Sequence, residues 1–231
     1  MTHSELRAVV ANKIWTFERP VWFSGVRQRV HTTVLRLDDG SLMLHSPAPV
    51  AAGMAEQLRA LGQVRWLVVP NCFHHLGTPA AAAQFPEATV VGPASALARN
   101  KDLKLSADLA QLGEQLPEFE ALPLAGVPFL DETVLYHRPT QTLLGADIVL
   151  CPNAKDHWSM RFAARLLGFY GQVRVPYDVK KKIPDKAAAA RSIQAMLERP
   201  AQRLIVGHTD VIGENCRDRL ARAWRLEGVE V

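Results

Sequence analysis

Three apolar segments of this chain each run directly into side chains that can bind a metal ion or carry a proton. Residues 66–69 are followed by His74 and His75, residues 143–146 by Asp147, and residues 204–207 by His208. Short apolar runs of this kind are typical of buried strands. In α/β proteins the carboxyl ends of the strands are the usual place for ligands and chemistry. The pattern therefore predicts an α/β fold whose site is built from three strand ends.

These four residues offer imidazole nitrogens and a carboxylate, which suit one zinc or iron ion. Each also has an ordinary structural interpretation: His74 and His75 could bond to loop backbone, Asp147 could cap a loop, and His208 could be a core histidine. Adjacent residues on an extended chain point to opposite sides, so His74 and His75 need not both reach one ion. Cys72 is either a thiolate ligand or a small buried apolar residue.

Composition narrows the class of protein. The chain has 231 residues, with no apolar run near the ~20 needed to span a membrane. Residues 1–7 lack the features of a signal peptide. The three cysteines show no CxxC spacing and fit a reducing compartment. We therefore expect a cytoplasmic protein without a membrane partner.

The charge distribution argues against a nucleic-acid-binding protein. The net charge of +4 is mild, and the basic run 180–182 is interpreted as a solvated loop before a helix. No basic stripe with interleaved aromatic residues is present, so we expect no nucleic-acid partner.

The order of predicted elements mixes hairpins with strand–helix units. Predicted strands cover 14–23, 29–37, 41–45, 66–69, 88–91, 118–124, 132–137, 141–149 and 203–206. Predicted helices cover 51–61, 78–85, 158–170, 185–198 and 214–227, with short helices between 94 and 115. Thr78 is expected to cap its helix and Pro79 to occupy the first turn. Two packed sheets with helices outside would bury these strands, and no linker divides residues 1–231, which predicts a single domain.

This order of elements, with its three strand ends, resembles the metallo-β-lactamase fold, a four-layer αββα sandwich with metals at one edge. His75-Leu76-Gly77 is similar to the end of that family's H-x-H-x-D-H-x-G motif. The same register puts His74 at the motif's Asp, and Pro70 and Cys72 at its first two histidines. Asp147 resembles the bridging aspartate, and Gly207-His208 resembles the last histidine. The family's separate middle histidine would fall near residues 127–129, where there is none.

The resemblance thus implies that the first metal site is lost and that the second keeps His74, His75, Asp147 and His208. A narrower resemblance is to an uncharacterised bacterial and plant branch of the superfamily, known as a domain of unknown function. It rests on Ile14-Trp15 and on residues 42–47 and 69–76. That branch implies no activity.

Two classes of function stay open, one an enzyme and the other not. The first is a mononuclear metal-dependent hydrolase of an ester, lactone, thioester or phosphoester. Three protein ligands would leave room for a water, whereas four would close a structural site. The second is a binding module that holds a small molecule without the two-metal site. One zinc or iron ion is the expected cofactor. We expect no nucleotide or flavin, because no flavin domain is present and the ligands are too few for two irons.

Overall fold

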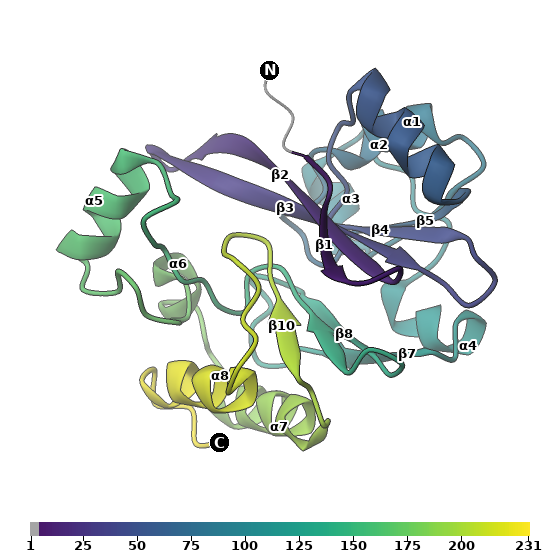
Figure 1. Cartoon of the computed structure of the whole chain (residues 1–231). Helices are drawn as coiled ribbons and strands as arrows, with labels where there is room; N and C mark the ends of the chain where they lie inside the picture. Colours follow the sequence, from purple (N-terminus) through teal and green to yellow (C-terminus); the bar gives the residue numbers. More distant parts are fainter. Residues whose placement is uncertain (1–4) are drawn as a thin grey trace. The chain divides into compact units, whose positions relative to one another are not determined.

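The computed structural model describes residues 5–231 and contains two β-sheets with helices. The six-stranded sheet has the order β1-β2-β3-β4-β5-β6, and the four-stranded sheet the order β10-β9-β8-β7 (Figure 1). Residues 1–4, which begin the stretch tested for a signal peptide, lie outside the described residues. The chain forms two compact units. The first unit contains the segment ending at Arg19 and His31–Pro117; the second contains Pro20–Val30 and Glu118–Val231. The prediction of a single domain over residues 1–231 stays a prediction.

The six-stranded sheet brings the ends of β4 and β5 together. Its strands are β1 (Arg7–Val10), β2 (Ile14–Phe23), β3 (Val26–Arg36), β4 (Leu42–His45), β5 (Val64–Val68) and β6 (Thr89–Val91). The predicted hairpin of β3 and β4 is antiparallel, whereas β4, β5 and β6 are parallel. His45 pairs with Val68, so the residues after β4 and those after β5 leave the sheet at the same edge.

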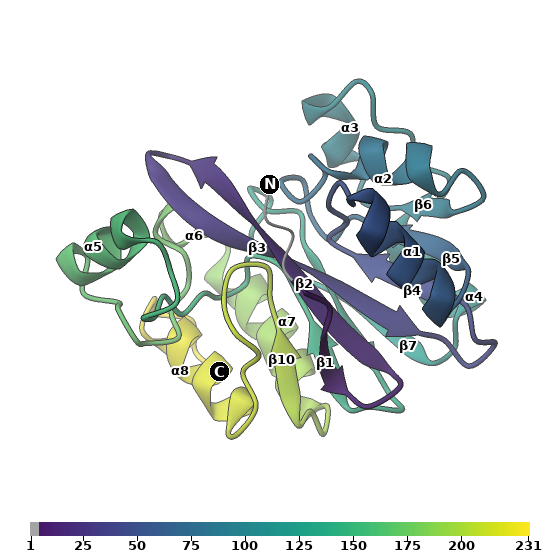
Figure 2. The same cartoon turned by 45° about the horizontal axis from the view of Figure 1, so that its top comes forward.

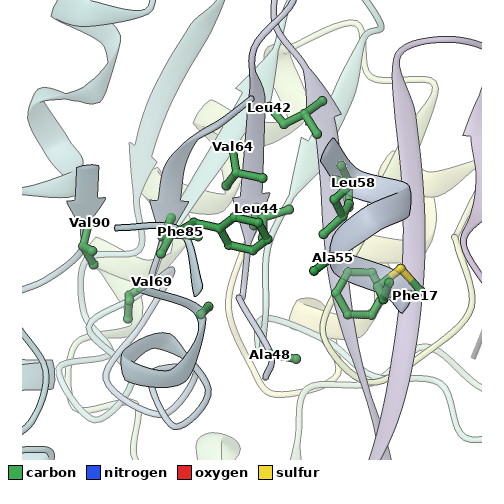
Figure 3. Packing of buried hydrophobic residues seen from close by; sticks show 14 of the residues in the cluster. Phe17, Leu42, Leu44, Ala48, Ala55, Leu58, Val64, Val69, Phe85 and Val90 are labelled. Carbon is green, nitrogen blue, oxygen red and sulfur yellow. The ribbon is translucent and has the colours of Figure 1, made fainter. Parts of the chain in front are cut away.

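Helices of the first unit are α1 (Ala52–Leu61), α2 (Thr78–Gln84), α3 (Ser95–Arg99), η1 (Leu109–Gln111) and α4 (Leu112–Gln115). Leu58 of α1 and Ala81 of α2 are fully buried and belong to one apolar cluster with Leu44 and Leu67 of the parallel strands. Figure 3 shows part of this cluster, including Leu44 and Leu58. Burying such an aliphatic side chain stabilises the fold by about 1.5–3 kcal/mol. This cluster holds the strands that carry the histidine loop, residues 70–77.

In the four-stranded sheet the strands are β7 (Phe119–Pro123), β8 (Thr133–His137), β9 (Thr142–Leu144) and β10 (Arg203–Ile205). β7, β8 and β9 are antiparallel, whereas β9 and β10 are parallel with Leu144 opposite Ile205. The parallel register continues beyond the strands, because the Gly145 N–H donates to the Ile205 carbonyl at 2.9 Å and the Gly207 N–H to the Ala146 carbonyl at 2.9 Å. Equivalent positions after β9 and β10 are therefore neighbours.

Helices of the second unit are α5 (Trp158–Leu166), α6 (Tyr177–Lys180), α7 (Lys186–Glu198) and α8 (Cys216–Arg225). Asp185 caps α7 by accepting from the Ala188 N–H at 2.8 Å, and Ile193 and Met196 are buried. α7 and α8 lie side by side in both views, and α8 buries Trp224 completely (Figures 1 and 2).

Three sequence predictions need correction, and two elements were not predicted. The strand predicted to continue to residue 149 ends at Leu144, because the N–H groups of Ala146 and Asp147 donate to the Glu132 side chain instead of to a strand. Thr78 is the first residue of α2 and makes no side-chain cap. The helix predicted to reach residue 170 ends at Leu166, before Gly168 with its φ of +73°. The two elements that were not predicted are β1 and α6, and Lys180 of the expected loop 180–182 is the last residue of α6.

Candidate metal centre

Asp147 and His208 form a close pair in the second unit. Each lies three positions beyond the end of a parallel strand, after Leu144 and Ile205. The Nε2 atom of His208 lies 3.1 Å from Oδ1 of Asp147, and both side chains are mostly buried. The ends of these two strands therefore meet, and ligation of a metal by the two side chains stays a prediction.

The orientation of His208 is set by a backbone carbonyl. Its Nδ1 lies 2.9 Å from the carbonyl oxygen of Arg29, and a carbonyl only accepts, so Nδ1 carries the proton. The other nitrogen, Nε2, then faces the Asp147 carboxylate and must carry a second proton or bind a cation. Burial lowers the pKa of His208, but the hydrogen bond and charge of Asp147 outweigh it, and the net pKa is raised. Metal-ligating histidines are commonly held by such a hydrogen bond from their second nitrogen.

Glu132 fixes the loop that carries Asp147. Its carboxylate is buried and accepts two backbone hydrogen bonds, from the Ala146 N–H at 2.7 Å and from the Asp147 N–H at 2.8 Å. Gly145 permits this close packing, since a Cβ there would lie 3.1 Å from Glu132 Oε1. Sequence reasoning missed Glu132, which stands alone before β8 without a motif.

Arg29 is held by two carboxylates. Its Nε donates to Asp156 at 2.8 Å and its Nη1 to Asp210 at 3.0 Å. Burial alone would lower the pKa of Arg29, but these two carboxylates raise it above its usual value. The same residue offers its carbonyl to His208, so the ion pairs also position the group that orients the imidazole. Arg29 was not predicted as a site residue.

The histidine loop of the first unit is ordered by Asn71. Its side-chain oxygen accepts from the Phe73 N–H at 2.9 Å and from the His74 N–H at 2.8 Å, which is a turn typical of asparagine. The Nδ1 atom of His74 lies 2.6 Å from the Ser46 hydroxyl. Nε2 is therefore the nitrogen of His74 that can serve as a metal ligand.

His75 has a different neighbour from His74. Its Nδ1 accepts from the side-chain amide of Asn100 at 3.3 Å. Burial, followed by the positive charges of Arg99 and His74, lowers the pKa of His75. The adjacent histidines thus contact different elements, as expected for neighbouring residues. Ligation of a metal by His75 stays a prediction.

His45 and Cys72 are buried beside this loop in the first unit. Burial, together with the charge of His74, lowers the pKa of His45 to about 3, so its imidazole is neutral at neutral pH. Neither interpretation of Cys72, as a thiolate ligand or as a small buried residue, is tested by its position.

The fold is that of the metallo-β-lactamases. A metallo-β-lactamase from Pontibacter korlensis superposes with a TM-score of 0.66 at 13% sequence identity, covering 97% of this chain and 99% of that one. The metallo-β-lactamase FIM-1 from Pseudomonas aeruginosa, solved in its mono-zinc form, gives 0.68 at 13% identity, covering 99% and 97%. DIM-1 metallo-β-lactamase gives 0.68 at 14% identity, covering 97% and 98%. The predicted fold class is confirmed, and at these identities the similarity concerns the fold alone.

Sequence comparisons add one partial match. Residues 11–96 match a family model described as Domain of unknown function (DUF4336), in agreement with the narrower resemblance noted above. No curated protein matches the chain. Within residues 5–231, no helix is long and apolar enough to cross a membrane.

The first unit supplies one candidate ligand and the second unit supplies two. His74, Asp147 and His208 are the candidate ligands, and they combine two imidazoles with one carboxylate. Zinc and ferrous iron both accept this set. His208 is also held through its second nitrogen, as metal ligands in proteins usually are.

Proposed function

We propose that this protein binds one zinc or iron ion through His74, Asp147 and His208 and acts as a metal-dependent hydrolase. The observation that carries the proposal is the approach of His208 Nε2 to Asp147 Oδ1 at 3.1 Å while Nδ1 is already committed to the Arg29 carbonyl. This geometry suits a cation bound by both groups, and without a cation it suits a protonated imidazole paired with the carboxylate. Three ligands leave a coordination position open.

Two residues outside the ligand set position Asp147 and His208 for the proposed chemistry. A bound zinc or iron ion would supply a Lewis acid that lowers the pKa of a coordinated water to about 7. Glu132 holds the backbone of Asp147, and the Arg29 carbonyl keeps the proton of His208 on Nδ1. We propose an ester, lactone, thioester or phosphoester as the substrate. FIM-1, which shares the fold, was solved in a mono-zinc form, and this supports one ion as a workable occupancy of the fold.

A binding module is the second candidate. It is favoured by the residues that stand at the first two histidine positions of the family motif. Pro70 and Cys72 are buried there, and neither is an imidazole. Such a protein would hold a small molecule without hydrolysing it.

Hydrolysis assays separate the two candidates. Protein loaded with zinc or ferrous iron is tested against panels of esters, lactones, thioesters and phosphoesters. We expect turnover in one class, lost in Asp147→Asn and kept in Asp178→Asn, whose carboxylate is exposed on α6. Metal-loaded protein that hydrolyses none of the four classes contradicts the hydrolase and favours the binding module.

A further inference from the structure

Helix α5 exposes an apolar face in the second unit. Trp158, Phe162 and Leu166 are four residues apart and therefore share one side of the helix. They are 64%, 65% and 75% exposed, and Leu167 is also exposed. Single exposed apolar residues are common, but a contiguous group of large ones marks an interaction surface.

The tip of the β2–β3 hairpin extends this surface. Trp22 and Phe23 are exposed just before the turn at Ser24 and Gly25. The Trp22 ring contacts the His157 ring edge-on at 5.7 Å between centroids, and the Arg27 N–H donates to the Ser159 hydroxyl at 3.0 Å. These contacts fix the hairpin tip beside the first turn of α5, and both views show the two side by side (Figures 1 and 2).

Positive charge is concentrated in the sequence segment that begins with α5. Residues 157–182 contain six basic side chains and one acidic one, a net charge of +5, whereas the whole chain carries +4. Arg165, Lys180, Lys181 and Lys182 are exposed. The remainder of the chain, with 21 basic and 22 acidic side chains, has a net charge of −1, so the net positive charge of the chain comes from this segment.

We propose that this surface, termed the α5 face, docks on a membrane that contains anionic phospholipid. The α5 face consists of the apolar residues Trp22, Phe23, Trp158, Phe162, Leu166 and Leu167 with the basic residues of segment 157–182. An amphipathic helix with Trp, Phe and Leu on one side and Arg beside it lies in the plane of the bilayer interface. Exposed lysines and arginines near it are attracted to anionic headgroups.

A second copy of the chain is disfavoured as the occupant, because it would bring together two segments that each have a net charge of +5, whereas an anionic surface attracts them. The proposal departs from the sequence-based expectation of no membrane partner, which considered only membrane-spanning segments. It does not depend on the metal centre, since none of the proposed ligands belongs to the α5 face.

Vesicle co-sedimentation tests the α5 face with the full chain. Vesicles of phosphatidylcholine alone are compared with vesicles of phosphatidylcholine mixed with phosphatidylserine, at low and high salt. We expect binding to the mixed vesicles only, weakened by salt. Trp158→Ser with Phe162→Ser should reduce binding about tenfold or more, because the apolar anchor is lost. Leu97→Ser, an exposed apolar residue of α3, is the matched control and should bind as the wild type does.

A second set of variants tests the charge. Replacing Lys180, Lys181 and Lys182 by Gln should also weaken binding to the mixed vesicles, and thermal unfolding verifies that each variant is folded. Absence of binding to the mixed vesicles, or binding that survives both sets of substitutions, overturns the proposal. Soluble polyglutamate is tested in the same way. If the protein binds polyglutamate but not vesicles, and the Trp158 and Phe162 substitutions do not change this binding, the proposal is overturned in favour of an acidic protein partner.

Discussion

The carboxylate of Asp147 lies 3.1 Å from Nε2 of His208, and each residue stands three positions after one strand of the parallel pair β9–β10. The parallel register makes equivalent positions beyond the two strands neighbours. The contact is therefore a consequence of strand pairing. The residues around Asp147 and His208 determine whether the two side chains share a proton or bind a metal ion.

Glu132→Gln should weaken both the loop and the metal centre. A glutamine side chain has one carbonyl oxygen, so it cannot accept from both the Ala146 and Asp147 N–H groups on separate oxygens. An unsatisfied buried N–H costs about 1–3 kcal/mol, and losing such a supporting contact lowers metal affinity about 10- to 100-fold. Chemical denaturation and metal titration measure the two effects. Glu114→Gln, on an exposed carboxylate of α4, is the control, and equal behaviour of the two variants would contradict the assigned role.

Arg29→Ala should destabilise the protein strongly. The substitution leaves the buried Asp156 carboxylate without its guanidinium partner, and breaking a buried ion pair on one side costs about 3–5 kcal/mol. Arg29→Lys keeps the charge but replaces a planar group by one nitrogen, so only part of the stability should return. The free energy of unfolding should therefore be highest for the wild type, intermediate for Arg29→Lys and lowest for Arg29→Ala, and chemical denaturation measures it. A lysine variant as stable as the wild type would show that the two-carboxylate geometry is unimportant.

The ion pair of Glu120 with Arg199 should make stability depend on acidity. The hydrogen bond from Arg199 lowers the pKa of Glu120 from its usual 4.5. The folded state then binds fewer protons than the unfolded state, so this stabilisation is present above pH 4.5 and is lost as pH falls through the lowered pKa. Because the pair is partly exposed, we expect about 0.5–1 kcal/mol.

Glu120→Gln should therefore lower the free energy of unfolding at neutral pH and match the wild type in strong acid. Denaturation curves across this range measure the difference. The exposed Glu87→Gln variant should show no such trend, and a Glu120→Gln deficit that persists unchanged at low pH would contradict the ion pair as its source.

Gly77→Ala should disturb the histidine loop. A Cβ at this position would lie 2.5 Å from the Pro47 carbonyl oxygen and 2.6 Å from Ala48 Cα, so backbone would have to move. We expect a loss of about 1–3 kcal/mol, as for overpacked sites. Gly53→Ala in α1 meets no atom within 4 Å and should stabilise by up to about 1 kcal/mol. Thermal unfolding of the two variants should give opposite shifts, and equal shifts would contradict the packing argument.

The sequence predicted the strands β5, β9 and β10 because an apolar run indicates a buried segment. The same property misled the prediction for residues 145–149: Ala146, Ile148 and Val149 are buried, yet the strand ends at Leu144. Burial does not distinguish a paired strand from a packed loop. For α5 a helix was predicted, but a predicted helix does not tell whether its apolar side faces inward, and Trp158 and Phe162 are exposed.

The supporting residues of the candidate site could not be predicted in this way. Glu132 acts on a backbone N–H 15 residues away, and the Arg29 carbonyl on a histidine 179 residues away. Neither residue belongs to a local motif, because its role arises from tertiary packing. Only the side chains at the strand ends carry a local signal.

Elemental analysis of protein purified without chelator tests the central claim most directly. The wild type is compared with His74→Ala and His208→Ala, with His75→Ala to test the fourth predicted ligand, and with His157→Ala as a control outside the candidate set. The account predicts about one zinc or iron per chain in the wild type and the control, with loss of the metal in His74→Ala and in His208→Ala while both remain folded. A wild type without stoichiometric metal after reconstitution, or one whose metal survives both substitutions, would contradict the account.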